Sequence, residues 1–144
     1  MISLQHLMLV AGGGAVGAVL RYVTQSGVVA MCGREFPYGT LVVNVAGSFL
    51  IGACYVFVTE RMLASSAQSP ILMGWDVLDG SGFRALVMIG LLGALTTFST
   101  FSFETIELLE QGKITAAGLN ILSNVVLCLG ACWIALWSTR QLLG

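Results

Sequence analysis

Residues 96–102 read TTFSTFS, a stretch with five hydroxyl side chains, with Phe98 and Phe101 between them and with no charge. The stretch follows eleven apolar residues, ALVMIGLLGAL, which run from Ala85 to Leu95. A helix that spans a bilayer needs about 20 largely apolar residues, so this segment is too short to span alone. It spans only if the helix continues through the hydroxyl cluster to about Leu109. The sequence therefore places TTFSTFS inside a membrane, near its middle.

The composition of the whole chain agrees with a membrane location. The chain has 144 residues, of which 57% are hydrophobic and 9% are charged. A soluble domain carries about 25% charged residues, so this chain cannot cover itself with a water-compatible surface. The net charge of −1 also argues against a nucleic-acid partner, which would require a basic surface. At this length we expect one domain, residues 1–144.

Hydropathy divides the chain into four transmembrane helices, at about residues 4–31, 38–62, 83–109 and 114–141. The third is expected to break at the hydroxyl cluster, which gives an all-α integral membrane protein. A polar surface loop is expected over residues 63–82, and a short turn over Glu110 to Lys113. The first basic residue is Arg21, so the N-terminus lacks the positive region of a signal peptide. It is expected to remain as an uncleaved first helix.

The basic residues indicate little preference for one orientation in the membrane. With four crossings, both termini and the loop after the second helix lie on one side. That side carries Arg61, Arg84 and Arg140, and the other carries Arg34 and Lys113, with Arg21 unassigned. Because the Lys/Arg bias sets orientation, the chain could insert both ways, and opposite copies could then pair. A weak but sufficient bias is the alternative.

The cysteines and the small residues favour packing over chemistry. Cys128 and Cys132 share a helix face at i, i+4, but His6 is the only histidine and no further ligands complete a metal site. Buried small hydrophobic residues are therefore the better interpretation of the cysteines. Glycine-rich stretches such as residues 12–18 allow helix backbones to approach closely and support an oligomer. We find no catalytic triad, carboxylate pair or phosphate loop, so catalysis is not indicated.

Polar residues inside the expected spans are the more informative feature. They are Arg21, Thr40, Asn44, Glu104, Asn120, Ser123 and Asn124, together with the TTFSTFS cluster. Polar groups are costly in hydrocarbon unless they face a partner or a water-filled path, so they are candidates for function. Ser, Thr and Asn also join helices by hydrogen bonds, so interhelical contacts are the alternative interpretation.

The hydroxyl cluster also suggests what a pathway here would carry. Its side chains compete for backbone hydrogen bonds and so favour a break in the helix. A break frees backbone groups, which membranes tolerate only where they are buried or line a cavity. Half-helix N-termini favour anions, while freed carbonyls favour cations. Phe98 and Phe101 lie on one helical face, and their electropositive ring edges could line an anion path without a full charge.

Three stretches of the chain resemble the Fluc, or CrcB, family of fluoride channels. They are GGGAVGAVLRY (residues 12–22), PYGTLVVNVAGSFLIG (residues 37–52) and GLLGALTTFSTFSFE (residues 90–104). The resemblance covers essentially the whole chain. It implies an antiparallel, dual-topology homodimer with two pores in the cell inner (cytoplasmic) membrane. It further implies passive export of fluoride, which relieves fluoride toxicity.

The resemblance also assigns residues to roles. Phe98 and Phe101 match the pore-lining rings, and Asn44 matches the pore amide of the second helix. The polar track beyond the rings is matched by Ser99, Thr100 and Glu104, and the vestibule arginine by Arg21. The backbone carbonyls of Gly93 and Thr96 match those that hold a structural sodium ion at the dimer interface.

The fourth helix departs from the family pattern. We predict that Asn124 lines the pore, at a position where relatives vary between Ser and His. Cys128 falls where a Ser is common. The residues of the fourth helix that contact the ion are therefore not assigned by the resemblance.

Two other classes of membrane protein remain in competition. A small proton-coupled exporter can also be a four-helix dimer, but it needs a membrane-embedded carboxylate, commonly in the first helix. The first helix has none, and Glu104 is the only candidate. A purely structural subunit is the third class, and the polar residues count against it.

Overall fold

The computed structural model describes residues 3–62 and 80–143, all of which lie in helices or short connections. The helices are α1 (Leu4–Cys32), α2 (Tyr38–Phe57), η1 (Val58–Met62), α4 (Gly80–Phe83), η2 (Arg84–Leu92), α5 (Gly93–Leu95), α6 (Phe98–Glu110) and α7 (Ile114–Leu143). Most of the expected polar loop, residues 63–79, lies outside the described residues. Residues 80–82, which were predicted to belong to that loop, are helical instead. Their glycines have low helix propensity, and this hid the start of the helix.

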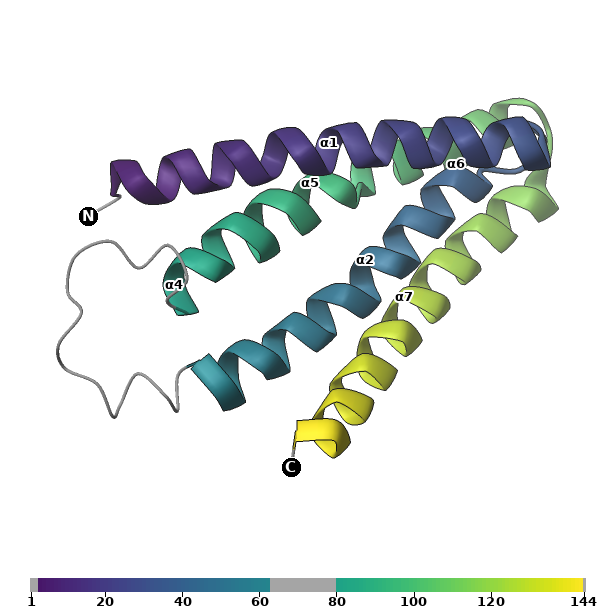
Figure 1. Cartoon of the computed structure of the whole chain (residues 1–144). Helices are drawn as coiled ribbons and strands as arrows, with labels where there is room; N and C mark the ends of the chain where they lie inside the picture. The colour runs from purple at the N-terminus through teal and green to yellow at the C-terminus, as the bar shows by residue number, and fades with distance from the viewer. Residues whose placement is uncertain (1–2, 63–79, 144) are drawn as a thin grey trace, which may run out of the picture.

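Within the residues that the structure describes, four helical spans are long and apolar enough to cross a membrane: Leu4–Cys32, Tyr38–Glu60, Gly80–Glu110 and Ile114–Leu143. Both termini, the end of η1 and the start of α4 lie at one end of the bundle (Figure 1). The two short turns lie at the other end. The prediction of four long apolar helices, with the third interrupted, is confirmed.

The helices pack as two pairs. α1 runs along η2 and α5, and α2 runs along α7 (Figure 1). The two pairs converge toward the end with the short turns and separate toward the termini. Val43, Leu92 and Leu95 form a buried apolar cluster between α2 and the third span. This cluster lies beside the break in the third span.

The contact between α1 and η2 depends on glycines. A Cβ atom added at Gly13 would overlap the Leu86 carbonyl oxygen, and one added at Gly17 would overlap the Leu91 carbonyl oxygen. Both obstacles are backbone atoms, which cannot rotate away. The glycine-rich stretch of the sequence therefore serves close helix packing, as small-residue faces do in membranes.

This packing leads to a stability prediction with a matched control. Gly13→Ala should destabilise the fold by about 1–3 kcal/mol, the usual cost of overpacking. Gly12→Ala should be neutral or slightly stabilising, because a Cβ at Gly12 meets nothing within 4 Å. Thermal unfolding of the two purified variants in detergent measures the difference. Equal melting temperatures would show that the backbones do not approach as closely as described.

Glycines also permit the two short turns. Gly33 (φ 80°) follows α1 and Gly112 (φ 73°) follows α6, both in the left-handed region that glycine adopts without strain. Lys113 Nζ lies 3.0 Å from Glu35 Oε2 and joins the two turns, with side chains 40% and 90% exposed. An ion pair this exposed contributes little to stability.

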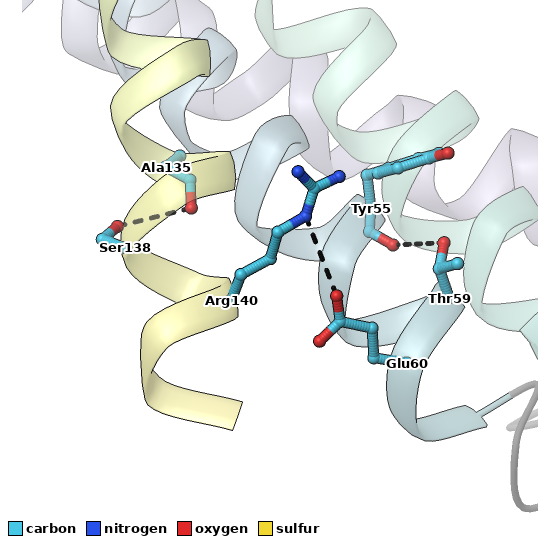
Figure 2. A network of polar contacts seen from close by, with 6 residues as sticks. All are labelled: Tyr55, Thr59, Glu60, Ala135, Ser138 and Arg140. Atoms are coloured by element: carbon cyan, nitrogen blue, oxygen red, sulfur yellow. Dashed lines mark hydrogen bonds and ion pairs between the residues drawn. The ribbon is translucent and has the colours of Figure 1, made fainter. Parts of the chain in front are cut away.

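A second polar network lies at the opposite end of the bundle, where α7 faces η1 (Figure 2). Arg140 Nε lies 3.8 Å from Glu60 Oε1 across the two helices. The Thr59 and Ser138 hydroxyls donate to carbonyls of their own helices, at Tyr55 and Ala135. The two hydroxyls satisfy nearby backbone carbonyls, and none of these contacts involves the break.

The break itself consists of two residues in extended conformation. Thr96 has φ −83° and ψ 156°, and Thr97 has φ −152° and ψ 115°. The first half-helix still closes at Leu92, whose carbonyl accepts from the Thr96 amide at 3.1 Å. Thr97 then caps α6, because its Oγ1 accepts from the Thr100 amide at 3.2 Å. The hydroxyl cluster thus ends one helix and starts the next, as predicted.

Candidate functional site

The break opens onto a cavity of about 490 Å³. Side chains and backbone from α2, η2, α5, the break, α6 and α7 line it. The lining residues are Asn44, Gly47, Ser48, Ile51, Leu92, Gly93, Thr96, Thr97, Phe98, Phe101, Asn124, Val125, Cys128 and Leu129. None of these residues carries a formal charge. Most of the wall is apolar, and the polar groups gather at the break and on the facing sides of α2 and α7.

Asn44 forms hydrogen bonds with the backbone at the break in the third span. Its Nδ2 donates to the Thr97 carbonyl at 3.2 Å, and its Oδ1 accepts from the Thr97 amide at 2.8 Å. One side-chain amide thus satisfies both backbone groups of a residue that has left the helix. Unpaired backbone groups are costly at membrane depth. Asn44 therefore stabilises the break as well as lining the cavity.

A chain of amides continues from Asn44 across α7. Asn44 Nδ2 also donates to Asn124 Oδ1 at 3.0 Å, and Asn124 Nδ2 donates to Asn120, both to the carbonyl at 3.1 Å and to Oδ1 at 3.0 Å. Asn120 is fully buried, and its Nδ2 reaches Thr105 Oγ1 at 2.9 Å. The chain joins α2, α7 and α6, so part of the intramembrane polarity does join helices, as the alternative interpretation held.

The break diverts two amides from the carbonyls they would meet in a continuous helix. In an α-helix the Thr97 amide would donate to Gly93, and the Thr100 amide would donate to Thr96. The first donates to Asn44 and the second to the Thr97 hydroxyl. The Gly93 and Thr96 carbonyls therefore lose their helical donors. These are the two carbonyls that the family resemblance assigns to a cation.

The two phenylalanine rings lie together at the start of α6. Their centroids are 5.4 Å apart and their planes are tilted by 54°. Phe101 is 9% exposed, whereas Phe98 is 78% exposed although it lines the cavity. The Phe101 ring is thus packed within the chain. The Phe98 ring is exposed at the edge of the cavity.

The hydroxyls after the break are hydrogen-bonded to one another. Thr97 Oγ1 donates to Thr100 Oγ1 at 2.9 Å and lies 3.3 Å from Ser99 Oγ. Ser99 and Thr100 do not line the cavity. They lie on α6 between the two lining rings, Phe98 and Phe101, with side chains outside the cavity lining.

Glu104 lies in a second polar cluster, one turn beyond Thr100. Gln25 Nε2 donates to Thr40 Oγ1 at 3.0 Å, and the Thr40 hydroxyl donates to Glu104 Oε1 at 2.8 Å. Among the described residues, the buried Glu104 Oε2 has no hydrogen-bond partner. The cluster joins α1, α2 and α6 outside the cavity.

Arg21 is another predicted site residue that the structure places outside the cavity. It lies on α1 and does not line the cavity. Within residues 3–62 and 80–143, no ion pair is formed by Arg21. Its assignment to a vestibule stays a prediction.

The structure also adds residues to the site. Thr40, Asn44 and Ser48 repeat at i, i+4 and i+8 on α2, so the spacing alone could have placed all three on one face. Ser48 and Cys128 line the cavity, and Thr97 supplies its backbone and its hydroxyl. All four cysteines are free. In the described part of the chain, no group of three or more His, Cys, Asp or Glu residues could hold a metal ion.

Four apolar helical spans, three of which line an uncharged cavity with a broken helix at its wall, are typical of a membrane protein of the channel or transporter class. The model of the family described as CrcB-like protein, Camphor Resistance (CrcB), matches residues 8–136. The chain belongs to this family.

Curated relatives carry the name fluoride-specific ion channel FluC. The protein from Shewanella amazonensis is 45% identical over 126 residues, which cover 88% of this chain and 89% of the relative. The protein from Hahella chejuensis is 42% identical over 142 residues, 99% of this chain and 100% of the relative. A relative from Methylococcus capsulatus is 42% identical over 136 residues, but the chain spans only 53% of its length. These names are of ion channels and not of enzymes.

Proposed function

We propose that this protein is a fluoride-specific ion channel that lets fluoride leave the cytoplasm passively across the cytoplasmic membrane. The single observation that carries the proposal is the cavity at the break, where two phenylalanine rings and the start of α6 meet. The names of the relatives supply the identity of the ion.

Attraction without a full charge suits conduction. An ion must bind well enough to enter and weakly enough to leave. The rings of Phe98 and Phe101, whose edges are electropositive, line the cavity together with the positive end of the α6 dipole, and no basic residue lines it to trap the anion. Each of these groups supplies a partial charge, which lowers the cost of partial dehydration without creating a deep well.

An antiparallel homodimer completes this proposal. Phe98 is largely exposed in one chain although it borders the cavity, so a second copy would bury it. The basic residues divide three against two between the sides when Arg21 is set aside. Such a chain has little reason to prefer one orientation.

The alternative of a proton-coupled exporter has less support. α1 contains no carboxylate, and Glu104 lies outside the cavity with one oxygen bonded to Thr40. An exporter would need a carboxylate that exchanges its proton with the substrate in the same cavity. The lining contains none.

A structural sodium ion fits the backbone carbonyls that the break releases from helical hydrogen bonds. The Gly93 and Thr96 carbonyls have lost their helical amides, and unwound backbone carbonyls are the usual sodium ligands in membrane proteins. Two copies about a twofold axis would supply four such oxygens. Neutral oxygens suit a monovalent ion, which would hold the two broken helices together.

The sodium proposal predicts a stability effect that does not depend on transport. The purified dimer should melt at a higher temperature in sodium chloride than in N-methylglucamine chloride of the same ionic strength. A ligand present at about 100 times its Kd stabilises by about 2.7 kcal/mol. Potassium chloride is the control for a general cation effect. Equal melting temperatures in all three salts would refute the sodium site.

Fluoride efflux from liposomes tests the proposed function. Vesicles loaded with fluoride and containing the purified protein should release it when potassium and valinomycin balance the charge. Release should persist when a protonophore removes any proton gradient. A proton-coupled exporter would not sustain release without the proton gradient. A structural subunit would release nothing.

A further inference from the structure

The amides at the cavity are already committed to protein acceptors. Asn44 donates its two N–H groups to the Thr97 carbonyl and to Asn124 Oδ1. Asn124 donates both of its side-chain N–H groups to Asn120. Neither amide that faces the cavity retains an N–H for an incoming anion.

The threonine hydroxyls at the break are committed as well. Thr96 Oγ1 donates to the Leu92 carbonyl at 3.0 Å, and Thr97 Oγ1 donates to Thr100 Oγ1. A hydroxyl has one proton to donate, so each is used. Two polar lining residues remain, Ser48 and Cys128.

Ser48 has an uncommitted hydroxyl. In the part of the chain that the structure describes, Ser48 Oγ forms no hydrogen bond, not even to the carbonyl four residues earlier. Thr59, Ser102 and Thr105 do bond back in this way within their helices. The Cys128 thiol is a much weaker donor than a hydroxyl. Ser48 is therefore the strongest free side-chain donor on the cavity wall.

We propose that Ser48 is an anion-binding residue of the cavity, whose hydroxyl donates a hydrogen bond to the permeating fluoride opposite the edges of Phe98 and Phe101. The inference rests on the proposed function. In this inference the Asn44 and Asn124 amides stabilise the break. The hydrogen-bond donor to the anion is Ser48, one turn further along α2. A fluoride ion that has shed part of its water needs such a donor, because hydrogen bonds to a charged partner are the strong ones.

The test compares Ser48→Ala, Ser48→Cys and Ser48→Thr in liposomes. The initial rate of fluoride efflux is measured against internal fluoride, which separates the half-saturating concentration from the maximal rate. Ser48→Ala should raise the half-saturating concentration about tenfold or more, because it removes a hydrogen bond to a charged group. Ser48→Cys should raise it by less, and Ser48→Thr should retain the wild-type value.

The matched control is Ser138→Ala, at the end of α7 (Figure 2), where the hydroxyl donates to the Ala135 carbonyl outside the cavity. It should leave the half-saturating concentration unchanged. An unchanged value in Ser48→Ala, measured per folded dimer, would overturn the inference while the proposed function stands. If Ser48→Ala yields no dimer, Ser48→Cys decides by the same criterion. A wild-type protein without fluoride efflux would refute the proposed function, and this inference with it.

Discussion

Replacing Phe101 by Ile should reduce fluoride flux per folded dimer about tenfold or more, and replacing Phe98 by Ile should do the same. The change preserves an apolar side chain of similar bulk and removes the positive ring edge. An edge contact is worth about 0.5–1.5 kcal/mol even between neutral rings, and an anion is attracted more strongly. Each loss of about 1.4 kcal/mol slows passage about tenfold.

Phe103→Ile supplies the control for this prediction. Phe103 lies on the same helix and is 68% exposed, but it does not line the cavity. Flux from liposomes should be unchanged in this variant when it is measured on the gel-filtered dimer. If the rings at Phe98 and Phe101 only pack, their replacement lowers the melting temperature and leaves flux per dimer intact. That result would remove them from the pathway.

Adding two lysines to the turn before α7 should abolish function. Glu110→Lys with Gln111→Lys places basic residues on the side that carries Arg34 and Lys113, and this side should then remain cytoplasmic. Every copy would insert the same way. An antiparallel dimer could not form, and fluoride flux would be lost without any change in the cavity.

A second variant with the opposite bias makes this test specific. Gln141→Lys with Leu142→Lys adds charge at the other end, and it too should be inactive alone. Co-expression of the two variants should restore flux, since the pair supplies one copy in each orientation. Tag accessibility reports the orientations directly. A single orientation of the unmodified protein, or full activity of either variant alone, would contradict dual topology.

The helices and the break were accessible to sequence reasoning because they depend on local properties. Hydropathy over about 20 residues predicts each span. The run of hydroxyls predicts the break, because these side chains compete for backbone hydrogen bonds. The start at Gly80 was missed since glycine weakens the helical signal. Local composition therefore predicts where the chain is helical, and small residues blur the ends.

The hydrogen-bond partners were not accessible in the same way. Asn44 was recognised as a polar residue in a span, but its bonds to Thr97 cross 53 positions of the sequence. Spacing shows which face of a helix a side chain occupies, not which group of another helix it meets. For the same reason the contacts from Gln25 to Thr40 and from Thr40 to Glu104 were not predicted. These contacts determine which donors stay free, so the donor at Ser48 emerged only from the structure.

The reversal potential of the current through the purified protein in a planar bilayer tests the central claim most directly. With fluoride, chloride and proton gradients of different size across the membrane, we predict a current that reverses at the fluoride equilibrium potential. Changing the chloride or proton gradient should leave that potential in place. A reversal potential that follows chloride or protons, or the absence of any current, would contradict a fluoride-specific channel.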